Sequence, residues 1–370
     1  MAAAAPRAAA ENLCDSSVAN CRTQLLTLIQ NEHVGIDVAF WFMQDARYSN
    51  EIIKRWQAGV PVRVLVDPRA NPSYPGNADI IAQLQQAGIP LRKRTAGGIL
   101  HWKMMLFAGQ NTVEFGSANF SPAAFVPGTP YTNYVSETIF YEDDAAVVDS
   151  FKVKFDDSWT DTTNFANFAN IDGPLQRTYP TFALDADMNW PPKQDYGARA
   201  VARYNAETQK IDVDMYRVTD QRHTNAIIAA FQRGVPVRYL GETLEYRNAS
   251  RLWVAWNMDR MYVAGIPMRV RASQGENHAK IVLLYGQGMT IFGSSNWTSA
   301  SATSQQEHNY FTTKSAIFQW FEDLFNRKWN NSAGHTETAA FVPLPPDKPV
   351  YQSPASDAVG VATSGVVLKW

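Results

Sequence analysis

Hydrophobic and polar residues follow the period of a strand in some segments of the chain and the period of a helix in others. Residues 36–42 (IDVAFWF) are rich in strand-forming residues and predict a strand. Residues 49–59 begin with a Ser-Asn cap and end at a glycine, which predicts a helix. An apolar run at 60–67 predicts a buried strand, and residues 78–88 predict a second helix. With the strands that follow, this segment predicts the order β-α-β-α-β-β.

The same pattern occurs twice. Both copies contain I-D-V, a helical run with I-I, then G-V-P-V-R, and later F-G-S-x-N. The offset between copies is 175 residues for Ile36 and Ile211, and 177 for Gly88 and Gly265. Because the two offsets are so similar, we infer that one unit has been duplicated, with minor changes in loop length. Alternating strands and helices predict an α/β fold with a largely parallel or mixed sheet in each copy.

The two copies also end alike. Residues 151–159 (FKVKFDDSW) and 321–329 (FEDLFNRKW) share the Phe, Phe and Trp spacing of an amphipathic helix. The chain is therefore divided into a leader at 1–24, a first half at 25–164, a connecting segment at 165–200, a second half at 201–331, and a C-terminal segment at 332–370. We expect the C-terminal segment to be a Pro-rich linker followed by the first strands of a truncated β-sandwich module.

Composition narrows the class of protein. Hydrophobic residues make up 45% of the 370 residues and charged residues 18%, which is typical of a soluble globular chain. The formal net charge of -2 gives no sign of the strongly basic face of a general nucleic-acid binder, although a local patch could still exist. No segment has the roughly 18 to 20 uninterrupted apolar residues that span a bilayer.

The N-terminus bears on location. Its Ala-rich start could be the end of a signal peptide or a plain leader. A disulfide between Cys14 and Cys21 would suit a secreted or periplasmic protein, whereas two free thiols would suit a cytoplasmic one. No His or further Cys lies at zinc-ligand spacing from this pair, and no other cluster predicts a metal site or a cofactor.

Two short motifs carry the candidate chemistry in each copy. On a strand, residues i and i+2 point to the same face, so each His and Lys should project together while Trp102 and Ala279 turn inward. The Gly-Ser-x-Asn motif follows a strand, where hydroxyl, amide and backbone N–H groups can converge on an anion. The motifs are His101-x-Lys103 with Gly116-Ser117-x-Asn119, and His278-x-Lys280 with Gly293-Ser294-x-Asn296.

This set of groups suits the cleavage of a phosphodiester. One imidazole can attack phosphorus and the other can protonate the leaving oxygen, while two Lys and the Asn and Ser donors stabilise negative charge. Each half supplies one imidazole, so two facing halves supply both. The reaction then requires no metal ion. Alignment of the closing helices places Glu137 opposite Glu307, and we expect these carboxylates to orient the histidines.

The paired motifs resemble the phospholipase D superfamily in its two-copy, single-chain form, over roughly residues 25–331. The resemblance implies two similar α/β sandwich lobes with the active site at their interface. It also implies that His101 is the nucleophile and His278 the general acid and base. The family motif continues H-x-K-x4-D, but Ala108 and Tyr285 occupy that position here. Because that Asp is mainly structural in the family, the chemistry stays plausible, but a divergent enzyme is then a possibility to test.

Three functions remain open. The first is a monomeric phospholipase D-like enzyme that hydrolyses phospholipids, or transfers them to alcohols, at a membrane surface it visits transiently. The second is a metal-independent nuclease, and the third is a non-catalytic module that binds phosphodiesters. Aromatic side chains near the motifs favour the lipid, and we expect Ser117 and Ser294 to contact the substrate. Trp102 and Trp297, with Trp253 and Trp256 as further candidates, either contact the substrate in the cleft or pack in the core or the lobe interface. The histidines without a repeated partner, including His223 and His308, are interpreted as surface or incidental residues.

Overall fold

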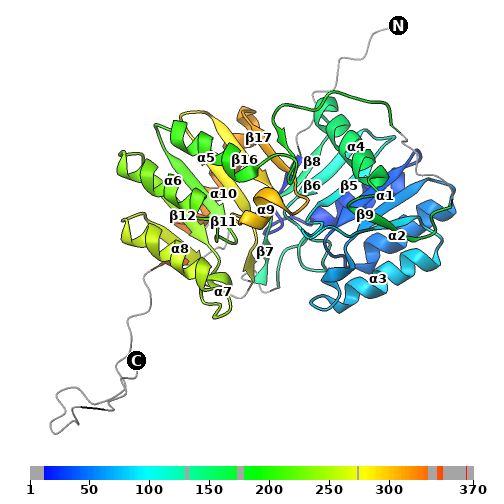
Figure 1. Cartoon of the computed structure of the whole chain (residues 1–370), viewed down its shortest axis with the longest axis horizontal. Coiled ribbons are helices and arrows are strands. Elements are labelled where there is room, and N and C mark those ends of the chain that lie inside the picture. Colours follow the sequence, from blue (N-terminus) through cyan, green and yellow to red (C-terminus); the bar gives the residue numbers. More distant parts are fainter. Residues whose placement is uncertain are drawn as a thin grey trace.

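The computed structural model describes residues 12–129, 133–172, 179–272, 275–331, 340–344 and 364. Two lobes lie side by side, each built on an eight-stranded mixed sheet with helices packed against it (Figure 1). The predicted duplicated α/β fold is confirmed.

The first lobe is formed by the N-terminal half of the chain. Its central strands β2 (Ile36–Phe40), β3 (Val62–Val66) and β4 (Leu91–Arg94) run parallel, and the strands beside them are antiparallel. The sheet order is β1 (Asn12–Cys14), β8 (Ile139–Glu142), β6 (Thr112–Gly116), β5 (Lys103–Phe107), β2 (Ile36–Phe40), β3 (Val62–Val66), β4 (Leu91–Arg94) and β9 (Phe165–Ala169). The helices are α1 (Cys21–Asn31), α2 (Ala46–Gln57), the 3-10 helix η1 (Pro68–Ala70), α3 (Pro75–Gln86) and α4 (Ala145–Thr160).

The second lobe repeats this arrangement strand for strand. Its sheet order is β10 (Met188–Asn189), β17 (Asn309–Thr312), β16 (Met289–Gly293), β15 (Lys280–Leu284), β11 (Ile211–Met215), β12 (Val237–Gly241), β13 (Met268–Arg271) and β18 (Phe341–Pro343). Its helices are α5 (Tyr196–Ala206), α6 (Gln221–Gln232), α7 (Thr243–Tyr246), α8 (Leu252–Val263), α9 (Ser299–Thr303) and α10 (Ser315–Asn330). A short parallel pair, β7 (Val135–Ser136) with β14 (Glu276–Asn277), joins the two lobes.

The repeated sequence signals have repeated structural causes. Asp45 and Asp220 cap α2 and α6, and each side chain accepts a hydrogen bond from the backbone two residues further on. Arg47 pairs with the Asp45 carboxylate, and the matched Arg222 pairs with that of Asp220. Gly59 and Gly234 follow these helices at φ 87° and 91°, where a side chain would be strained.

The edge strands of both sheets lie in segments that the sequence pattern places outside the two halves. Strand β1 lies in the predicted leader, and β18 lies in the predicted linker. Strands β9 and β10 lie in the connecting segment, where β9 closes the first sheet and β10 opens the second. These strands have two to five residues, too few to show a clear period. Apart from residue 364, the proposed β-sandwich start lies outside the described residues, as do residues 1–11 of the leader.

One hydrophobic core extends across both lobes. Phe115 of β6 stacks on Phe292 of β16 with ring centroids 6.0 Å apart. Helices α4 and α10 contribute their Phe stripes to this same core. Two further cores lie on the outer faces, beneath α1–α3 in the first lobe and beneath α5, α6 and α8 in the second. Because the interface is packed like an interior, the lobes hold their facing residues in a fixed geometry.

Candidate active site

The two H-x-K motifs meet at the lobe interface. His101 lies two residues before the start of β5, and His278 lies two residues before the start of β15. Each backbone N–H donates across the interface, His101 to the carbonyl of Gln306 and His278 to that of Ser136, both at 2.9 Å. Both imidazoles line one cleft and are 8% exposed, so they are reachable but largely desolvated.

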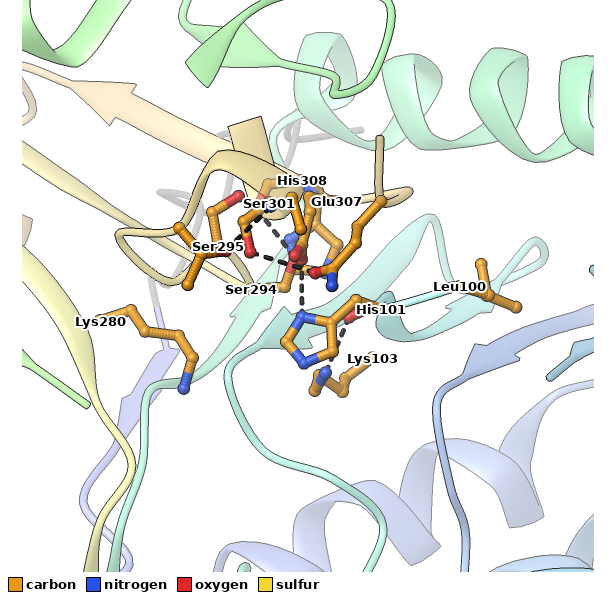
Figure 2. A network of polar contacts seen from close by, with 12 residues as sticks. Leu100, His101, Lys103, Lys280, Ser294, Ser295, Ser301, Glu307 and His308 are labelled. Atoms are coloured by element: carbon orange, nitrogen blue, oxygen red, sulfur yellow. Dashed lines mark hydrogen bonds and ion pairs between the residues drawn. The ribbon is translucent and has the colours of Figure 1, made fainter. Parts of the chain in front are cut away.

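Each histidine is held by a carboxylate from the opposite lobe. Nδ1 of His101 lies 2.8 Å from Oε2 of Glu307, as Figure 2 shows. Nδ1 of His278 lies 2.9 Å from the carboxylate oxygens of Glu137. The sequence predicts these two carboxylates as orienting groups, but not that each acts on the histidine of the other lobe. With Nδ1 engaged, Nε2 is the ring nitrogen left to face a substrate.

The motif serines bind these carboxylates. Ser117 Oγ donates to Glu137 at 2.5 Å, and Ser294 Oγ donates to Glu307 at 2.5 Å. Both serines are fully buried, and each hydroxyl also accepts a backbone N–H of the neighbouring strand segment. The expectation that Ser117 and Ser294 contact the substrate is therefore wrong. They fix the carboxylates that in turn fix the histidines.

The motif glycines make this contact possible. A Cβ at Gly116 would lie 2.1 Å from the carbonyl oxygen of Thr138, and one at Gly293 would lie 2.2 Å from that of His308. No side chain fits at that distance, so glycine lets the chain carrying the serine approach the segment carrying the carboxylate. The G-S pair thus acts as one unit that positions a carboxylate.

Two buried lysines supply positive charge. Lys103 Nζ donates to the carbonyl of His101 at 2.8 Å, and Lys280 Nζ donates to that of His278 at 2.5 Å. Figure 2 shows both ammonium groups on the side of the His101 ring that faces away from Glu307. Burial lowers the pKa of Lys103 to about 7 and that of Lys280 to about 8. The side chains of Asn119 and Asn296 line the same cleft, as their spacing predicts.

The two His–Glu pairs hold protons differently. Burial lowers the pKa of His101 to about 4, although Glu307 acts against this. Burial would raise the pKa of Glu307, but His101 beside it holds that pKa below its usual range. Burial instead raises the pKa of Glu137 to about 7, while it lowers the pKa of His278 well below 6.5. The His278–Glu137 pair therefore retains a shared proton near neutral pH, whereas His101 is neutral beside an ionised carboxylate.

The walls of the cleft are unlike one another. The cleft encloses about 290 Å³. Tyr216 packs edge-on against the His278 ring at 4.7 Å between centroids. The motifs do not predict the wall residues, although Trp41 and Tyr216 are aromatic at matched positions after matched strands. The first lobe contributes Trp41, Phe42 and Tyr74, and the second contributes Tyr216, Arg217, Arg251 and Glu276.

Both motif tryptophans are core residues. Trp102 is 1% exposed and packs on Trp190 with centroids 5.9 Å apart. Trp297 is 0% exposed and stacks on His223 at 4.8 Å. The expectation that Trp102 and Trp297 bind substrate is therefore wrong, because an aromatic residue next to a motif turns its ring into the lobe. His223 and His308 are likewise buried, not at the surface.

Tyrosine hydroxyls stand near the missing motif aspartates. Tyr285 occupies that position in the second lobe and donates to Asp212 at 2.7 Å. In the first lobe, where the position is Ala108, Tyr179 comes from the connecting segment and donates to Asp37 at 2.7 Å. Asp37 and Asp212 are matched residues that pair with matched arginines. Ala108 and Tyr285 are not among the residues that line the cleft.

Within the ranges that the structure describes, no group of three or more His, Cys, Asp or Glu side chains is arranged to hold a metal ion. Within those same ranges, no helix has the length and apolar character to cross a bilayer.

Comparison with known families gives a match over most of the chain. The family model for the phospholipase D-like domain of cardiolipin synthase matches residues 25–159 and 203–329. The chain belongs to the phospholipase D superfamily. Both copies of the superfamily motif lie within the matched segments.

Two solved structures have a similar fold but low sequence identity to this chain. Phosphatidylserine synthase from Haemophilus influenzae Rd KW20 is 14% identical, with a TM-score of 0.69 over 90% of this chain and 87% of that one. Polyphosphate kinase from Porphyromonas gingivalis is 13% identical, with a TM-score of 0.59 over 86% of this chain and 50% of that one. No curated protein matches the chain in sequence.

Proposed function

We propose that this phospholipase D superfamily member cleaves phospholipid phosphodiesters through a covalent phosphohistidine. The observation that carries the proposal is the crossed arrangement of the site. Each imidazole is oriented by a carboxylate of the opposite lobe, and both face one cleft beside two buried ammonium groups. Such an arrangement serves a reaction that needs a nucleophile, a proton carrier and fixed positive charge at one phosphorus atom.

The reaction proceeds in two displacements. Nε2 of His101 attacks phosphorus and forms a P–N bond, while the P–O bond to the leaving alcohol breaks. The leaving oxygen takes a proton from His278, so the alcohol departs neutral. A water molecule or a second alcohol then gives its proton to His278, and its oxygen displaces His101 from phosphorus. Lys103 and Lys280 stabilise the charge on the non-bridging oxygens in both steps.

The protonation of the two pairs supports this assignment of roles. A nucleophile must present a free lone pair, and the lowered pKa of His101 keeps it neutral. A general acid must carry a proton at working pH, and the His278–Glu137 pair retains one up to about pH 7. A bound diester adds negative charge beside His278, which favours the imidazolium further.

The proposal names phospholipid as the substrate. The matching family model describes a cardiolipin synthase domain, and one protein of similar fold is a phosphatidylserine synthase. The net charge of -2 does not favour a polyanionic nucleic acid. The acceptor is either water or an alcohol, so the enzyme is either a hydrolase or a transferase.

We also propose that the protein works in an oxidising compartment. Cys14 and Cys21 form a disulfide that ties β1 to the start of α1. Disulfides of this kind persist in secreted and periplasmic proteins and are rare in a reducing cytoplasm.

A paired assay tests the proposed function. Phosphatidylcholine and plasmid DNA are offered separately, with EDTA present, and the lipid reaction is repeated with added ethanol or glycerol. We expect head-group release from the lipid, new phosphatidyl-alcohol if transfer is favoured, and no product with His101→Ala. Cleavage of the DNA but not the lipid would make the enzyme a nuclease, and no product from either would overturn the proposal.

A further inference from the structure

Exposed apolar side chains gather on one part of the second lobe. Among the described residues, nine large hydrophobic side chains are exposed, and six of them lie on α7 and α8. Val263 is 84% exposed and Leu252 is 70% exposed, values more typical of lysine than of valine or leucine. We call this surface the α8 face; it consists of Leu244, Leu252, Trp253, Trp256, Tyr262 and Val263.

The α8 face is the outward side of an already packed helix. Helix α8 buries Val254, Met258 and Met261 against the lobe, at the spacing of one helical face. Leu252, Trp256 and Val263 follow the opposite spacing and point to solvent. Burial in the lobe therefore does not account for them, because α8 already has its apolar contact with the core.

The duplicated fold offers an internal comparison. Helix α3 of the first lobe is the counterpart of α8, at the offset of 177 residues. Trp253 corresponds to Gly76, and Trp256 corresponds to Asp79. Tyr262 and Val263 correspond to two glutamines of α3. The same position in the same fold is thus stable with a polar surface, so the apolar residues of α8 serve something other than folding.

The α8 face borders the mouth of the active-site cleft. Arg251 lines the cleft and is followed directly by Leu252, the first residue of α8. On the other side, Tyr74 lines the cleft and is followed directly by α3. The mouth therefore lies between the first turns of these two helices, and α7, α8 and α3 lie along the same edge of the molecule in Figure 1.

The chemistry of the α8 face matches the interfacial zone of a lipid bilayer. Trp253 and Trp256 pack edge-on with centroids 5.3 Å apart, and the Arg260 guanidinium lies 4.6 Å over the Trp256 ring. Tryptophan prefers the boundary between head groups and acyl chains, and arginine beside it can reach lipid phosphates. Arg251, which pairs with Glu245, adds a second guanidinium at the cleft end of the face.

The size of the cleft gives a reason for such contact. Its volume of about 290 Å³ lies at the low end of the range for pockets that hold one small ligand, roughly 300 to 1,000 Å³. That is room for a diester and a small head group but not for two long acyl chains. The chains of a phospholipid would therefore stay in the bilayer while its head group enters the cleft.

We propose that the α8 face docks this protein on a phospholipid bilayer, with Trp253, Trp256 and Val263 inserted at the interface. The proposal rests on the proposed function for its purpose, but it concerns a separate surface. Docking there would place the cleft mouth at the height of the lipid phosphates.

Vesicle binding tests the proposal without relying on turnover. The variant Trp253→Gln/Trp256→Gln/Val263→Gln would be compared with the full chain by co-sedimentation with vesicles of phosphatidylcholine, with and without phosphatidylglycerol. Variants of matched α3 positions, Gln85→Ala/Gln86→Ala, serve as the control. We expect the α8 variant to bind at least about tenfold more weakly and the α3 variant to bind like the unmodified chain. Brominated lipids should quench the fluorescence of the unmodified chain more than that of the α8 variant.

Activity separates this proposal from the proposed function. On a soluble nitrophenyl phosphodiester, the α8 variant should keep its rate within about twofold, while on vesicles it should lose about tenfold or more. Equal vesicle binding by the α8 variant and the unmodified chain would overturn the docking surface. Self-association of the unmodified chain, abolished in the variant and without vesicle binding, would also overturn it. Vesicle binding without activity on any diester would sink the proposed function and leave the docking surface standing.

Discussion

The two sides of the active site present the same pairs to the cleft but support them differently. Behind Glu137, the adjacent Ser136 contacts the buried Lys328, which pairs with Asp214 at 2.8 Å. Behind Glu307, the matched residue Gln306 donates to Ser158 at 2.6 Å and accepts from Arg94 at 2.9 Å. One side is thus backed by a buried ion pair and the other by an amide network.

This difference shows which parts of a duplicated site are constrained by chemistry. The imidazole, ammonium, carboxylate and serine hydroxyl occur in both copies at matched positions, because both are needed at one phosphorus atom. The groups behind them only have to hold a backbone segment in place, and several kinds of polar contact can do that. The outer surface has diverged most, as the comparison of α8 with α3 shows.

Replacing the two crossed carboxylates should give the largest effects and should separate the roles of the histidines. Glu307→Gln and Glu137→Gln keep the shape but remove the charge, and each should lower kcat by about 10²- to 10⁴-fold. In the unmodified enzyme, the rate should fall above about pH 7, as the His278–Glu137 pair loses its proton. A carboxylate stabilises the imidazolium, so Glu137→Gln should move this decline to lower pH.

The pH profile of Glu307→Gln is the matched control. Its alkaline decline should stay near that of the unmodified enzyme, because His101 does not carry the proton that is lost there. Identical shifts of the alkaline limb in both variants would contradict the assignment of separate roles.

Removing Lys328 should destabilise the protein more than removing its counterpart. Lys328→Met leaves Asp214 buried and without its ammonium partner, which should cost about 3 to 5 kcal/mol of unfolding free energy. Ser158→Ala removes two neutral hydrogen bonds, one accepted from Gln306 and one donated to the Lys154 carbonyl, and should cost about 1 to 2 kcal/mol. Urea unfolding of the two variants measures the difference. Equal losses of unfolding free energy in the two variants would mean that the buried ion pair and the amide network contribute alike.

The tyrosines near the missing motif aspartates should give the smallest effects. Tyr285→Phe and Tyr179→Phe each remove one hydrogen bond to a carboxylate that keeps its arginine partner. Each should lower the unfolding free energy by about 1 kcal/mol and leave kcat unchanged. A large loss of kcat in either variant would show that these positions do more than support the lobes.

The sequence predicts the duplication, the imidazole–ammonium pairs and the two carboxylates, because each depends on spacing that repeats. It does not predict that the carboxylates cross, since spacing within one copy carries no information about which surfaces of two copies meet. The role of the serines is not predicted for a related reason. Gly116 and Gly293 let the next strand segment approach closely, and each serine hydroxyl then donates to the carboxylate of that segment instead of facing the substrate.

Other differences have local causes. Trp102 alternates with His101 and Lys103, and the same alternation that brings the His to the cleft carries the indole into the core. Trp297 follows Asn296 and is likewise buried. The edge strands β1, β9, β10 and β18 are short and gain stability from pairing with a formed sheet, which a local pattern does not report.

The most direct measurement of the central claim uses His278→Ala with a nitrophenyl phosphodiester. Nitrophenolate leaves without a protonating group, so His101 can still attack, but the water that releases the enzyme has lost its base. We predict a burst of one nitrophenolate per active site, then a stall, with phosphorus found on His101 by mass spectrometry. His101→Ala should give no burst. A burst in His101→Ala with phosphorus on His278, or no burst in either variant, would contradict the account.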